Sequence, residues 1–374
     1  MREKTSKYLI LGGTGAIGGA LAQILADKGE VYVTTRSDRK SEGNIHYIKG
    51  NAHNLDFISF VLKDKFDSIV DFMKYDISEF TNQRINILLS NTEHYIFLSS
   101  SRVYGNLNTS ITEDTPRLLE TVLDSEYLQT NEYAVLKARK EDILKSVPKK
   151  NWTIIRLYIT YNTERLQLGV LEKEQWLYRA LHGRTILFFK DIGEHFTTMT
   201  YGYDLANILS LILNKKESFG ETYHITTSEC LKWNDILNIY KDILSTKLGK
   251  TTKIKQIDKA EQIKSLNKYQ FKYCRHFDRR FDNSKVMKLV GTDYNFTSTK
   301  EGLKKCLEQF IEEHGSFKDI NWAQQAEFDK LTKEITTLSE ITGLRNKIKY
   351  LLYRFTPYQR IRPLLIKLRH RLFK

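Results

Sequence analysis

Short apolar runs alternate with longer amphipathic stretches over the first 160 residues of the chain. In the longer stretches, apolar residues recur every three or four positions, which predicts helices such as those expected over 17–28 and 57–65. Each short run is expected to be a buried strand. The expected strands are Lys7–Leu11, Val31–Thr35, His46–Lys49, Ser68–Phe72, Tyr95–Ser99 and Thr153–Leu157. This alternation predicts an α/β fold in which right-handed crossovers build a parallel sheet.

We expect a Rossmann-type, doubly wound parallel sheet formed by residues 1–160, with 196–226 returning to it. A smaller substrate-binding lobe is expected over 161–310, at the carboxyl ends of the strands, where ligands bind in such sheets. The last part of the chain, 311–374, is expected to form a helical basic extension. A chain of 374 residues is long enough for this arrangement.

A glycine-rich turn follows the first predicted strand and precedes the first predicted helix. Its three spaced glycines are separated by two residues in each gap. A dinucleotide site needs one glycine for the tight turn, one for close approach of the pyrophosphate and one for packing of helix against strand. The cofactor-binding candidates of this turn are Gly12, Thr14, Gly15, Ala16, Ile17 and Gly18.

The end of the second predicted strand distinguishes two forms of the cofactor. NAD sites place an acidic residue there, which accepts a hydrogen bond from the ribose 2′-hydroxyl. Here no acid stands at Thr35, and Arg36, Arg39 and Lys40 follow. Because these cations attract a 2′-phosphate, we predict NADP(H) in preference to NAD(H). The alternative is a solvated basic loop, with NAD(H) as the cofactor.

Two further candidates follow predicted strands. Asn51 comes after the third strand and Lys74 after the fourth, so both are expected at the carboxyl edge of the sheet. Asn51 is predicted to contact the cofactor. Lys74 either contacts a cofactor phosphate or lines the cleft.

Ser100, Tyr133 and Lys137 form a candidate catalytic set. Ser100 follows the fifth predicted strand, and the tyrosine and lysine are four residues apart, which places them on one face of a helix. A tyrosine phenol ordinarily loses its proton near pH 10, and an ammonium group one helical turn away stabilises the phenolate. We expect the tyrosine to transfer a proton, the lysine to support it and bind the cofactor ribose, and the serine to polarise the reacting oxygen.

With these residues the chain resembles the extended short-chain dehydrogenase/reductase family, which comprises sugar-nucleotide epimerases, dehydratases and reductases. The resemblance rests on the glycine turn, on the Tyr/Lys pair and on the segments 99–105, 113–116, 152–157, 200–206 and 220–225. In that family, the serine three residues before the Val of Val-Tyr-Gly is catalytic, which implies Ser100.

The resemblance implies a hydride-transferring enzyme. We predict an NADPH-dependent reductase that acts on a keto group of a nucleotide-activated sugar or sugar derivative, for the synthesis of surface polysaccharide precursors. The alternative is an epimerase on the same substrates. A dehydratase is less expected, because dehydratases of the family tend to have Thr-Asp-Glu where this chain has Ser100-Ser101-Arg102. The candidates for substrate contact are Ser101, Arg102, His195 and Arg279.

Positive charge is concentrated at the end of the chain. The net charge is +14, and residues 341–374 hold ten Lys or Arg and no Asp or Glu. These cations are interleaved with bulky apolar residues, which favours an anionic membrane surface or docking on a partner protein over binding of nucleic acid. The alternatives are packing of this tail on its own subunit or on a neighbouring subunit, and a non-catalytic RNA- or membrane-binding member of the fold.

The cysteines and the lengths of the apolar runs bear on the cellular compartment of the protein. Cys230, Cys274 and Cys306 are widely spaced and form neither a metal-ligand pattern nor a disulfide framework, so no metal site is predicted. The glycine turn begins at residue 12, which leaves no room for a signal peptide, and no apolar run approaches the roughly 18 residues of a spanning helix. We expect a cytoplasmic homodimer or larger homo-oligomer, peripheral at the inner face of the membrane.

Overall fold

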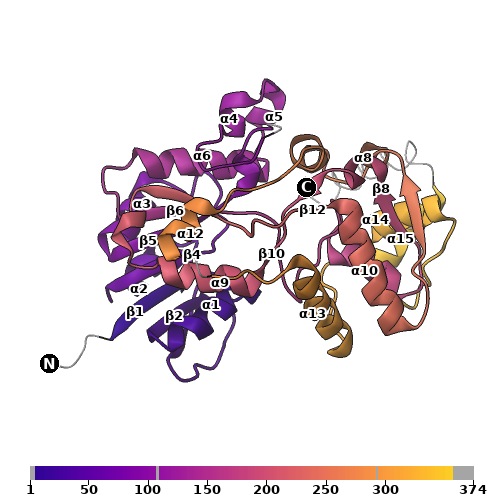
Figure 1. The fold of residues 1–374 in the computed structure, drawn as a ribbon. Helices are drawn as coiled ribbons and strands as arrows, with labels where there is room; N and C mark the ends of the chain where they lie inside the picture. The colour runs from indigo at the N-terminus through magenta and orange to yellow at the C-terminus, as the bar shows by residue number, and fades with distance from the viewer. Residues whose placement is uncertain (1–4, 107–108, 292–293, 357–374) are drawn as a thin grey trace, which may run out of the picture. The chain divides into compact units, whose positions relative to one another are not determined.

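The computed structural model describes residues 5–106, 109–291 and 294–356 (Figure 1). The chain divides into two units and passes from one to the other several times, so each unit consists of three separate segments. Unit 1 consists of Met1–Glu164, Phe196–Leu231 and Phe277–Cys306. Unit 2 consists of Arg165–His195, Lys232–His276 and the chain from Leu307 onward.

A parallel sheet of seven described strands forms the centre of unit 1, in the order β11-β6-β5-β4-β1-β2-β3. The strands are β1 (Ser6–Leu11), β2 (Gly29–Thr35), β3 (Ile45–Lys49), β4 (Phe66–Asp71), β5 (Thr92–Ser100), β6 (Trp152–Leu157) and β11 (Glu221–Ile225). Each predicted strand overlaps one of these, and the predicted α/β class with a Rossmann-type parallel sheet is confirmed. The order reverses between β1 and β4, which is the switch point where such sheets bind ligands.

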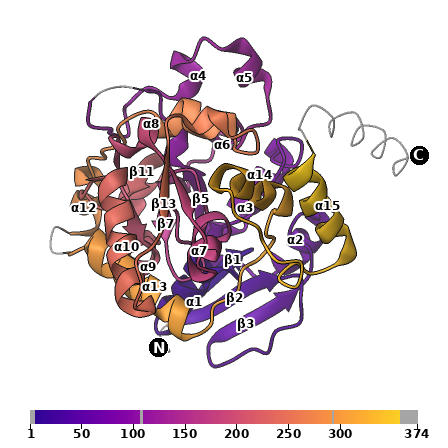
Figure 2. The same cartoon turned by 90° about the vertical axis from the view of Figure 1, so that its right-hand side faces the viewer.

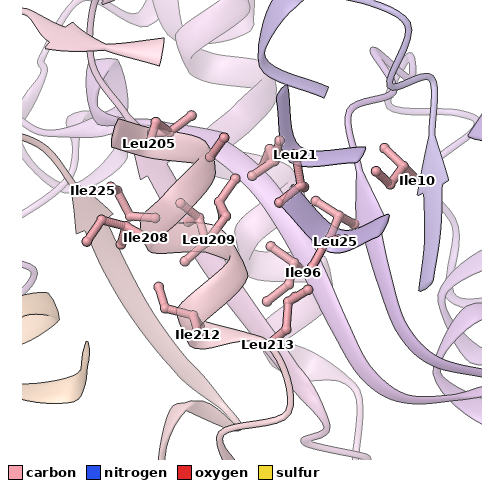
Figure 3. Packing of buried hydrophobic residues seen from close by; sticks show 14 of the residues in the cluster. Ile10, Leu21, Leu25, Ile96, Leu205, Ile208, Leu209, Ile212, Leu213 and Ile225 are labelled. Atoms are coloured by element: carbon pink, nitrogen blue, oxygen red, sulfur yellow. The ribbon is translucent and has the colours of Figure 1, made fainter. Parts of the chain in front are cut away.

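Helices cover both faces of this sheet. The helices of unit 1 are α1 (Ala16–Ala26), α2 (Leu55–Val61), α3 (Asn82–Ser90), α4 (Leu118–Thr121), α5 (Ser125–Gln129), α6 (Tyr133–Ser146), α9 (Gly202–Ile212) and α12 (Ser284–Val290). Alternate residues of β1 enter opposite cores. Ile10 packs with Leu21 of α1 and Leu209 of α9 (Figure 3), whereas Leu9 packs with residues of α2 and α3 such as Ile58.

The second predicted helix begins earlier than expected. The side chain of Asn54 accepts hydrogen bonds from the backbone N–H groups of Asp56 and Phe57, so the helix starts at Leu55 and ends at Val61 rather than covering 57–65.

Residues 277–306, which we expected in the substrate lobe, belong to unit 1. Asp204 of α9 binds this segment, because it accepts hydrogen bonds from the Tyr294 hydroxyl and from the backbone N–H of Thr297, at 3.0 and 2.8 Å. Val286 of α12 is fully buried in the core of this unit. A short parallel pair, β7 (Thr160–Tyr161) and β10 (Thr200–Tyr201), completes unit 1.

Unit 2 is built mainly of helices around a parallel pair of strands, β8 and β13. Its elements are α7 (Lys173–Leu181), β8 (Ile186–Phe189), α8 (Lys190–Gly193), α10 (Trp233–Leu248), β13 (Ile254–Ile257), α11 (Lys268–Gln270), α14 (Trp322–Thr332) and α15 (Leu344–Phe355). Short strands β9 (Phe196–Thr197) and β12 (Leu231–Lys232) and helix α13 (Thr299–Glu312) lie at crossings between the units. No helix of the described ranges is long and apolar enough to cross a bilayer.

The described part of the C-terminal extension is integrated into the core of unit 2. Arg179 of α7, which is fully buried, pairs with Asp329 at 2.6 Å and with Glu334 at 2.8 Å. The hydroxyl of Tyr350 in α15 donates to Asp329 at 2.6 Å, and its ring packs with Trp322 and Tyr178. The expected tail over 341–374 is therefore packed on its own unit as far as residue 356, and its last part, 357–374, lies outside the described residues.

Candidate active site

The glycine turn between β1 and α1 has the geometry that a phosphate-binding turn requires. Gly12 has φ +67°, a conformation that favours glycine. A Cβ atom on Gly18 would lie 2.6 Å from the Cα atom of Gly13, so only glycine permits this close packing of helix against turn. A Cβ atom on Gly15 would meet no atom within 4 Å, which leaves open space above the turn.

The first residues of α1 face this open space. Thr14, Gly15 and Ala16 are exposed, whereas Ile17 is half-buried against the core. No side chain caps the N-terminus of α1, so its first backbone N–H groups are directed outward. A helix N-terminus with open N–H groups and small residues fits the pyrophosphate of a dinucleotide.

A pocket of about 270 Å³ opens beside the turn, at the carboxyl ends of β1, β2, β3 and β4. Beside Gly12 and Thr14 of the turn, it brings together three predicted cofactor residues that follow separate strands, Arg36, Asn51 and Lys74. Arg39 and Lys40 do not line it, and the guanidinium of Arg39 lies 5.7 Å from the ring centroid of Tyr47. The lining residues that sequence reasoning missed are Thr34, Thr35, Gly50, Ala52, His53, Phe72 and Met73.

The charge of this pocket is basic. Arg36 and Lys74 line it, and none of its described lining residues is acidic. His53 also lines it, and its Nδ1 lies 2.7 Å from Oε1 of Glu79, which is outside the lining. The nearest acidic residue after β2 along the chain, Asp38, is outside the lining and forms an ion pair with Lys49 at 2.6 Å. The pocket therefore lies where the adenosine half of a dinucleotide binds in such sheets, and its described lining contains no carboxylate.

Three consecutive serines at the end of β5 have different environments. The Ser99 hydroxyl donates to Glu141 at 2.6 Å, and the Ser101 hydroxyl donates to the backbone carbonyl of Arg156 at 3.2 Å. Ser100 caps the short helical turn that follows, since its hydroxyl oxygen accepts from the N–H of Arg102 at 3.2 Å. Ser101 is fully buried, so the structure does not place this predicted substrate contact on an accessible surface.

Tyr133 and Lys137 share one face of α6. The ammonium group of Lys137 lies 6.0 Å from the ring centroid of Tyr133 and donates to the carbonyl of Leu98 on β5 at 2.6 Å. Tyr133 is 42% exposed and Lys137 only 7%. Burial lowers the pKa of Lys137 to about 8, against the opposing effect of the carboxylates of Asp71 and Glu141. The pair thus combines an accessible phenol with a buried cation.

Sequence reasoning missed two polar residues beside this lysine. Asp71, at the end of β4, is buried and accepts from the Tyr95 hydroxyl at 2.8 Å and from the N–H of Met73 at 2.9 Å. Burial raises the pKa of this carboxyl. Lys140, one turn after Lys137, donates to the carbonyl of Tyr75, and burial lowers its pKa to about 8. The position of Asp71 at a strand end was the only sequence signal for either.

A buried polar network connects the segments on which the family resemblance rests. Arg156 of β6 pairs with Glu141 of α6 at 2.7 Å, and its guanidinium lies 4.5 Å from the ring centroid of Tyr104. The Tyr104 hydroxyl bonds to Nδ1 of His224 at 3.0 Å, and the backbone N–H of His224 donates to the Glu113 carboxylate at 2.9 Å. Burial opposes the charge of Glu141, but the guanidinium and the Ser99 hydroxyl hold its pKa below the ordinary value. The network fixes β5, α6 and β6 behind Ser100.

The three other candidates for substrate contact have separate surroundings. Arg102 pairs with Glu132 at 2.6 Å and lies 5.7 Å from the ring centroid of Tyr133, so it is part of the surface around that phenol. Arg279 is buried and donates to the carbonyl of Gly105 at 3.1 Å, which supports the loop after β5. His195 belongs to unit 2, where its carbonyl accepts from the N–H of Trp233 at 3.2 Å.

A comparison with known protein families identifies the family of this chain. Residues 8–226 match the family model described as the NAD dependent epimerase/dehydratase family. The chain belongs to this family. The matched range contains the glycine turn, the basic pocket and the Ser100/Tyr133/Lys137 set. Membership makes the protein an NAD(P)-dependent enzyme of the extended short-chain dehydrogenase/reductase type, as predicted. No curated protein sequence matches the chain.

Solved structures of family enzymes have the same fold. A dTDP-glucose 4,6-dehydratase from Bacillus anthracis in complex with NAD has a TM-score of 0.62 and 18% identity, covering 82% of this chain and 97% of its own. A UDP-glucuronic acid 4-epimerase from Bacillus cereus, in complex with UDP-glucuronic acid and NAD, has a TM-score of 0.60 and 20% identity, covering 82% and 99%. A UDP-N-acetylglucosamine 4-epimerase from Methanobrevibacter ruminantium M1 has a TM-score of 0.62 and 18% identity, covering 83% and 99%.

The described side chains were also compared with the arrangements that hold metal ions. No group of three or more His, Cys, Asp or Glu side chains in the described ranges is arranged to hold a metal ion.

Proposed function

We propose that this family member is an NADPH-dependent reductase that acts on a keto group of a nucleotide-activated sugar or sugar derivative, in the synthesis of surface polysaccharide precursors. The observation that carries the proposal is Arg36, at the end of β2 and in the lining of the basic pocket. Nucleotide-activated sugars as the substrate class are supported by the two solved 4-epimerases, which are complexes with UDP-glucuronic acid and UDP-N-acetylmuramic acid.

The form of the cofactor follows from the charges in the pocket. An NAD site uses a carboxylate to accept the ribose 2′-hydroxyl, and the described lining has none. Arg36 supplies a guanidinium that binds a 2′-phosphate, and His53 and Lys74 add hydrogen-bond donors nearby. NADPH serves as an exchangeable reductant, so this preference favours net reduction over an internal oxidation and reduction.

The catalytic residues are arranged for the proton half of the reaction. When bound, the cofactor supplies the hydride. The Ser100 hydroxyl polarises the substrate carbonyl, and the Tyr133 phenol donates a proton to the oxygen as negative charge develops on it. Lys137 stabilises the phenolate left behind, because its ammonium group lies on the same face of α6. The exposure of the two side chains suits these roles, because Tyr133 is exposed and Lys137 is buried.

Elimination of water is not supported by the residues beside Ser100. Ser101, in the place of an acidic residue, is fully buried and bonded to the backbone of β6. Arg102, in the place of a second acid, is already paired with Glu132. We therefore do not assign a dehydratase activity.

An epimerase is the second candidate. The family description and the two 4-epimerases among the solved relatives favour it. An epimerase keeps its cofactor and returns the hydride to the same substrate, so it shows no net consumption of NADPH.

The proposed setting is the cytoplasm. The cysteines Cys230, Cys274 and Cys306 are all free thiols, which suits a reducing compartment. We also propose a homo-oligomer, which light scattering of the purified enzyme tests directly.

One experiment tests both the reaction and the cofactor. The enzyme is incubated with a panel of keto and hydroxy nucleotide sugars while NADPH absorbance and product mass are followed together. Consumption of NADPH with a mass gain of about two daltons, as expected for hydride plus proton, supports the reductase. An isomeric product without consumption identifies the epimerase.

Two matched variants test the contribution of Arg36 to cofactor affinity. Arg36→Ala is expected to weaken NADPH binding about tenfold to a hundredfold and leave NADH binding almost unchanged, because only the phosphate contact is lost. Arg39→Ala is the control, since this arginine follows the same strand but lies outside the pocket lining. Equal affinity of the unmodified enzyme for NADH and NADPH, by calorimetry, would remove the basis of the proposal.

A further inference from the structure

Helix α15 has one face buried in unit 2. Tyr350 is fully buried, its hydroxyl donates to Asp329 of α14, and Tyr353 packs against the same cluster. Figure 2 shows α15 beside α14. These contacts fix the rotation of the helix about its own axis, so the opposite face is turned toward solvent.

The solvent face carries a stripe of large apolar side chains. Four residues are exposed despite their size, namely Leu344 (74%), Ile348 (50%), Leu351 (37%) and Phe355 (62%). They follow one another at intervals of three or four positions, so at 3.6 residues per turn they fall within an arc of roughly 60°. Exposed apolar residues scattered singly are ordinary, but a continuous stripe on one helix marks an interaction surface.

Cations flank this stripe on both sides. Arg345 and Lys349 follow along one edge in the helical projection, and Lys347 and Arg354 along the other. In the described part of the chain, no carboxylate pairs with Arg345, Lys347 or Lys349. An apolar stripe between two rows of cations is the pattern of a helix that lies in the interface of an anionic bilayer.

The positive charge of the surrounding chain favours an anionic partner. Residues 341–374 contain no Asp or Glu, and six further Lys or Arg follow residue 356 in the sequence. Two copies of this face would bring like charges together, which disfavours self-association through it. The helix has 12 residues, too few to span a bilayer, so it would lie parallel to the surface.

We propose that the solvent face of α15 is a membrane-docking surface, which inserts Leu344, Ile348, Leu351 and Phe355 among the acyl chains of an anionic bilayer while the flanking cations bind lipid headgroups. The proposal concerns unit 2 alone and is independent of the reaction catalysed. It adds peripheral membrane attachment to an enzyme whose catalytic set lies in unit 1.

The test is co-sedimentation of the full chain with vesicles. One preparation is phosphatidylcholine alone, and the other contains about one-third phosphatidylglycerol, an anionic lipid. We expect binding to the anionic vesicles at low salt, a marked decrease at high salt, and little binding to the neutral vesicles. Ile348→Asp and Phe355→Asp should each lower the partition coefficient for anionic vesicles about tenfold.

The chain offers a matched control in Phe60 of α2. Its exposure, 63%, equals that of Phe355 within one percentage point, but it lies in unit 1. Phe60→Asp should leave vesicle binding unchanged. Unfolding temperatures of the three variants, measured in parallel, identify any loss of fold.

Two outcomes would overturn the proposal. One is unchanged binding of Ile348→Asp and Phe355→Asp to anionic vesicles, which would exclude α15 as the docking surface even if the chain binds elsewhere. The other is failure of the unmodified chain to bind, together with an oligomer that dissociates in Ile348→Asp by light scattering. In that case the stripe is a contact between subunits.

Discussion

Arg156 in unit 1 and Arg179 in unit 2 are both buried arginines that hold a buried carboxylate. Arg156 pairs with Glu141 at 2.7 Å, and Arg179 pairs with Asp329 at 2.6 Å. Both are almost without solvent exposure. Their partners differ in origin, since Glu141 is 15 positions from its arginine and Asp329 is 150 positions away.

The difference shows that the same interaction serves two purposes. The Arg156 network joins the segments of family resemblance and supports the strand end at Ser100. The Arg179 network attaches α14 and the segment before α15 to the rest of unit 2. Disruption of the first should therefore affect both chemistry and stability, and disruption of the second should affect stability alone.

The largest expected effect is on the chemistry of unit 1. Tyr133→Phe removes the proton donor, and we expect turnover to fall about ten-thousandfold, equivalent to about 5.5 kcal/mol of transition-state stabilisation. Because Tyr133 is half-exposed, the unfolding temperature should stay the same. Steady-state kinetics and calorimetric unfolding of the same preparation measure both. Substantial residual turnover would assign the proton transfer to another group.

The two arginines provide the direct test of the comparison. Arg179→Met and Arg156→Met each remove the arginine partner of a buried carboxylate, although Asp329 keeps its hydrogen bond from Tyr350 and Glu141 keeps the one from Ser99. Each variant should lower the free energy of unfolding by about 3 kcal/mol. Denaturant unfolding measures this loss. Turnover of the protein that remains folded should fall only in Arg156→Met. Equal loss of turnover in both variants would mean that the Arg179 network also supports the site.

Two truncations test how much α15 contributes to the stability of unit 2. A chain that ends at Glu340 lacks Ile341 and Tyr350, both fully buried, and should be less stable by about 3 kcal/mol. A chain that ends at Thr356 keeps these contacts and serves as the control. If both truncated chains unfold at the temperature of the full chain, α15 contributes nothing to the stability of unit 2.

The smallest expected effect concerns pH. Lys137 must be charged to stabilise the phenolate, and burial lowers its pKa to about 8, so turnover should fall as the pH rises through about 8. The carboxylate of Asp71 raises the pKa of this lysine, so Asp71→Asn should move the fall to lower pH by a fraction of a unit. The exposed Glu93 on β5 provides the control variant Glu93→Gln.

The sign of the stability effect separates this loss from unfolding. Between pH 8 and the ordinary lysine pKa of 10.5, the folded state binds fewer protons at Lys137 than the unfolded state does. This group therefore makes the protein more stable as the pH rises through that window. A profile in which Asp71→Asn and the unmodified enzyme coincide would show that Asp71 does not control the charge of Lys137.

Local patterns were sufficient to predict much of unit 1. Strand positions follow from short apolar runs, and the roles of Gly12 and Gly18 follow from their spacing in the turn. Arg36 was predicted to contact the cofactor because it follows the end of the second predicted strand. These features depend on neighbours in the sequence, so one chain is enough to recognise them. The assignments of Ser100, Tyr133 and Lys137 to catalysis stay predictions, although the structure places the last two together.

Contacts between distant segments were beyond prediction. Nothing near Asp329 indicates that it meets Arg179, and nothing in 277–306 indicates a return to unit 1, because both depend on how separate elements pack. The stripe on α15 was hidden for the same reason. Its sequence is apolar on two faces, and only the burial of Tyr350 shows which face is covered.

The repeated crossing of the chain between the two units has a consequence for its synthesis. Unit 1 is not complete until residue 306 has been made, because its third segment is Phe277–Cys306. On the ribosome, β6 is made before its partner β11, whose last residue follows that of β6 by 68 positions. At ordinary elongation rates this delay is roughly 3–14 s. During that time the growing sheet exposes an edge strand, β6, that has no partner on one side. Until β11 is made, this edge is therefore open to pairing with another strand.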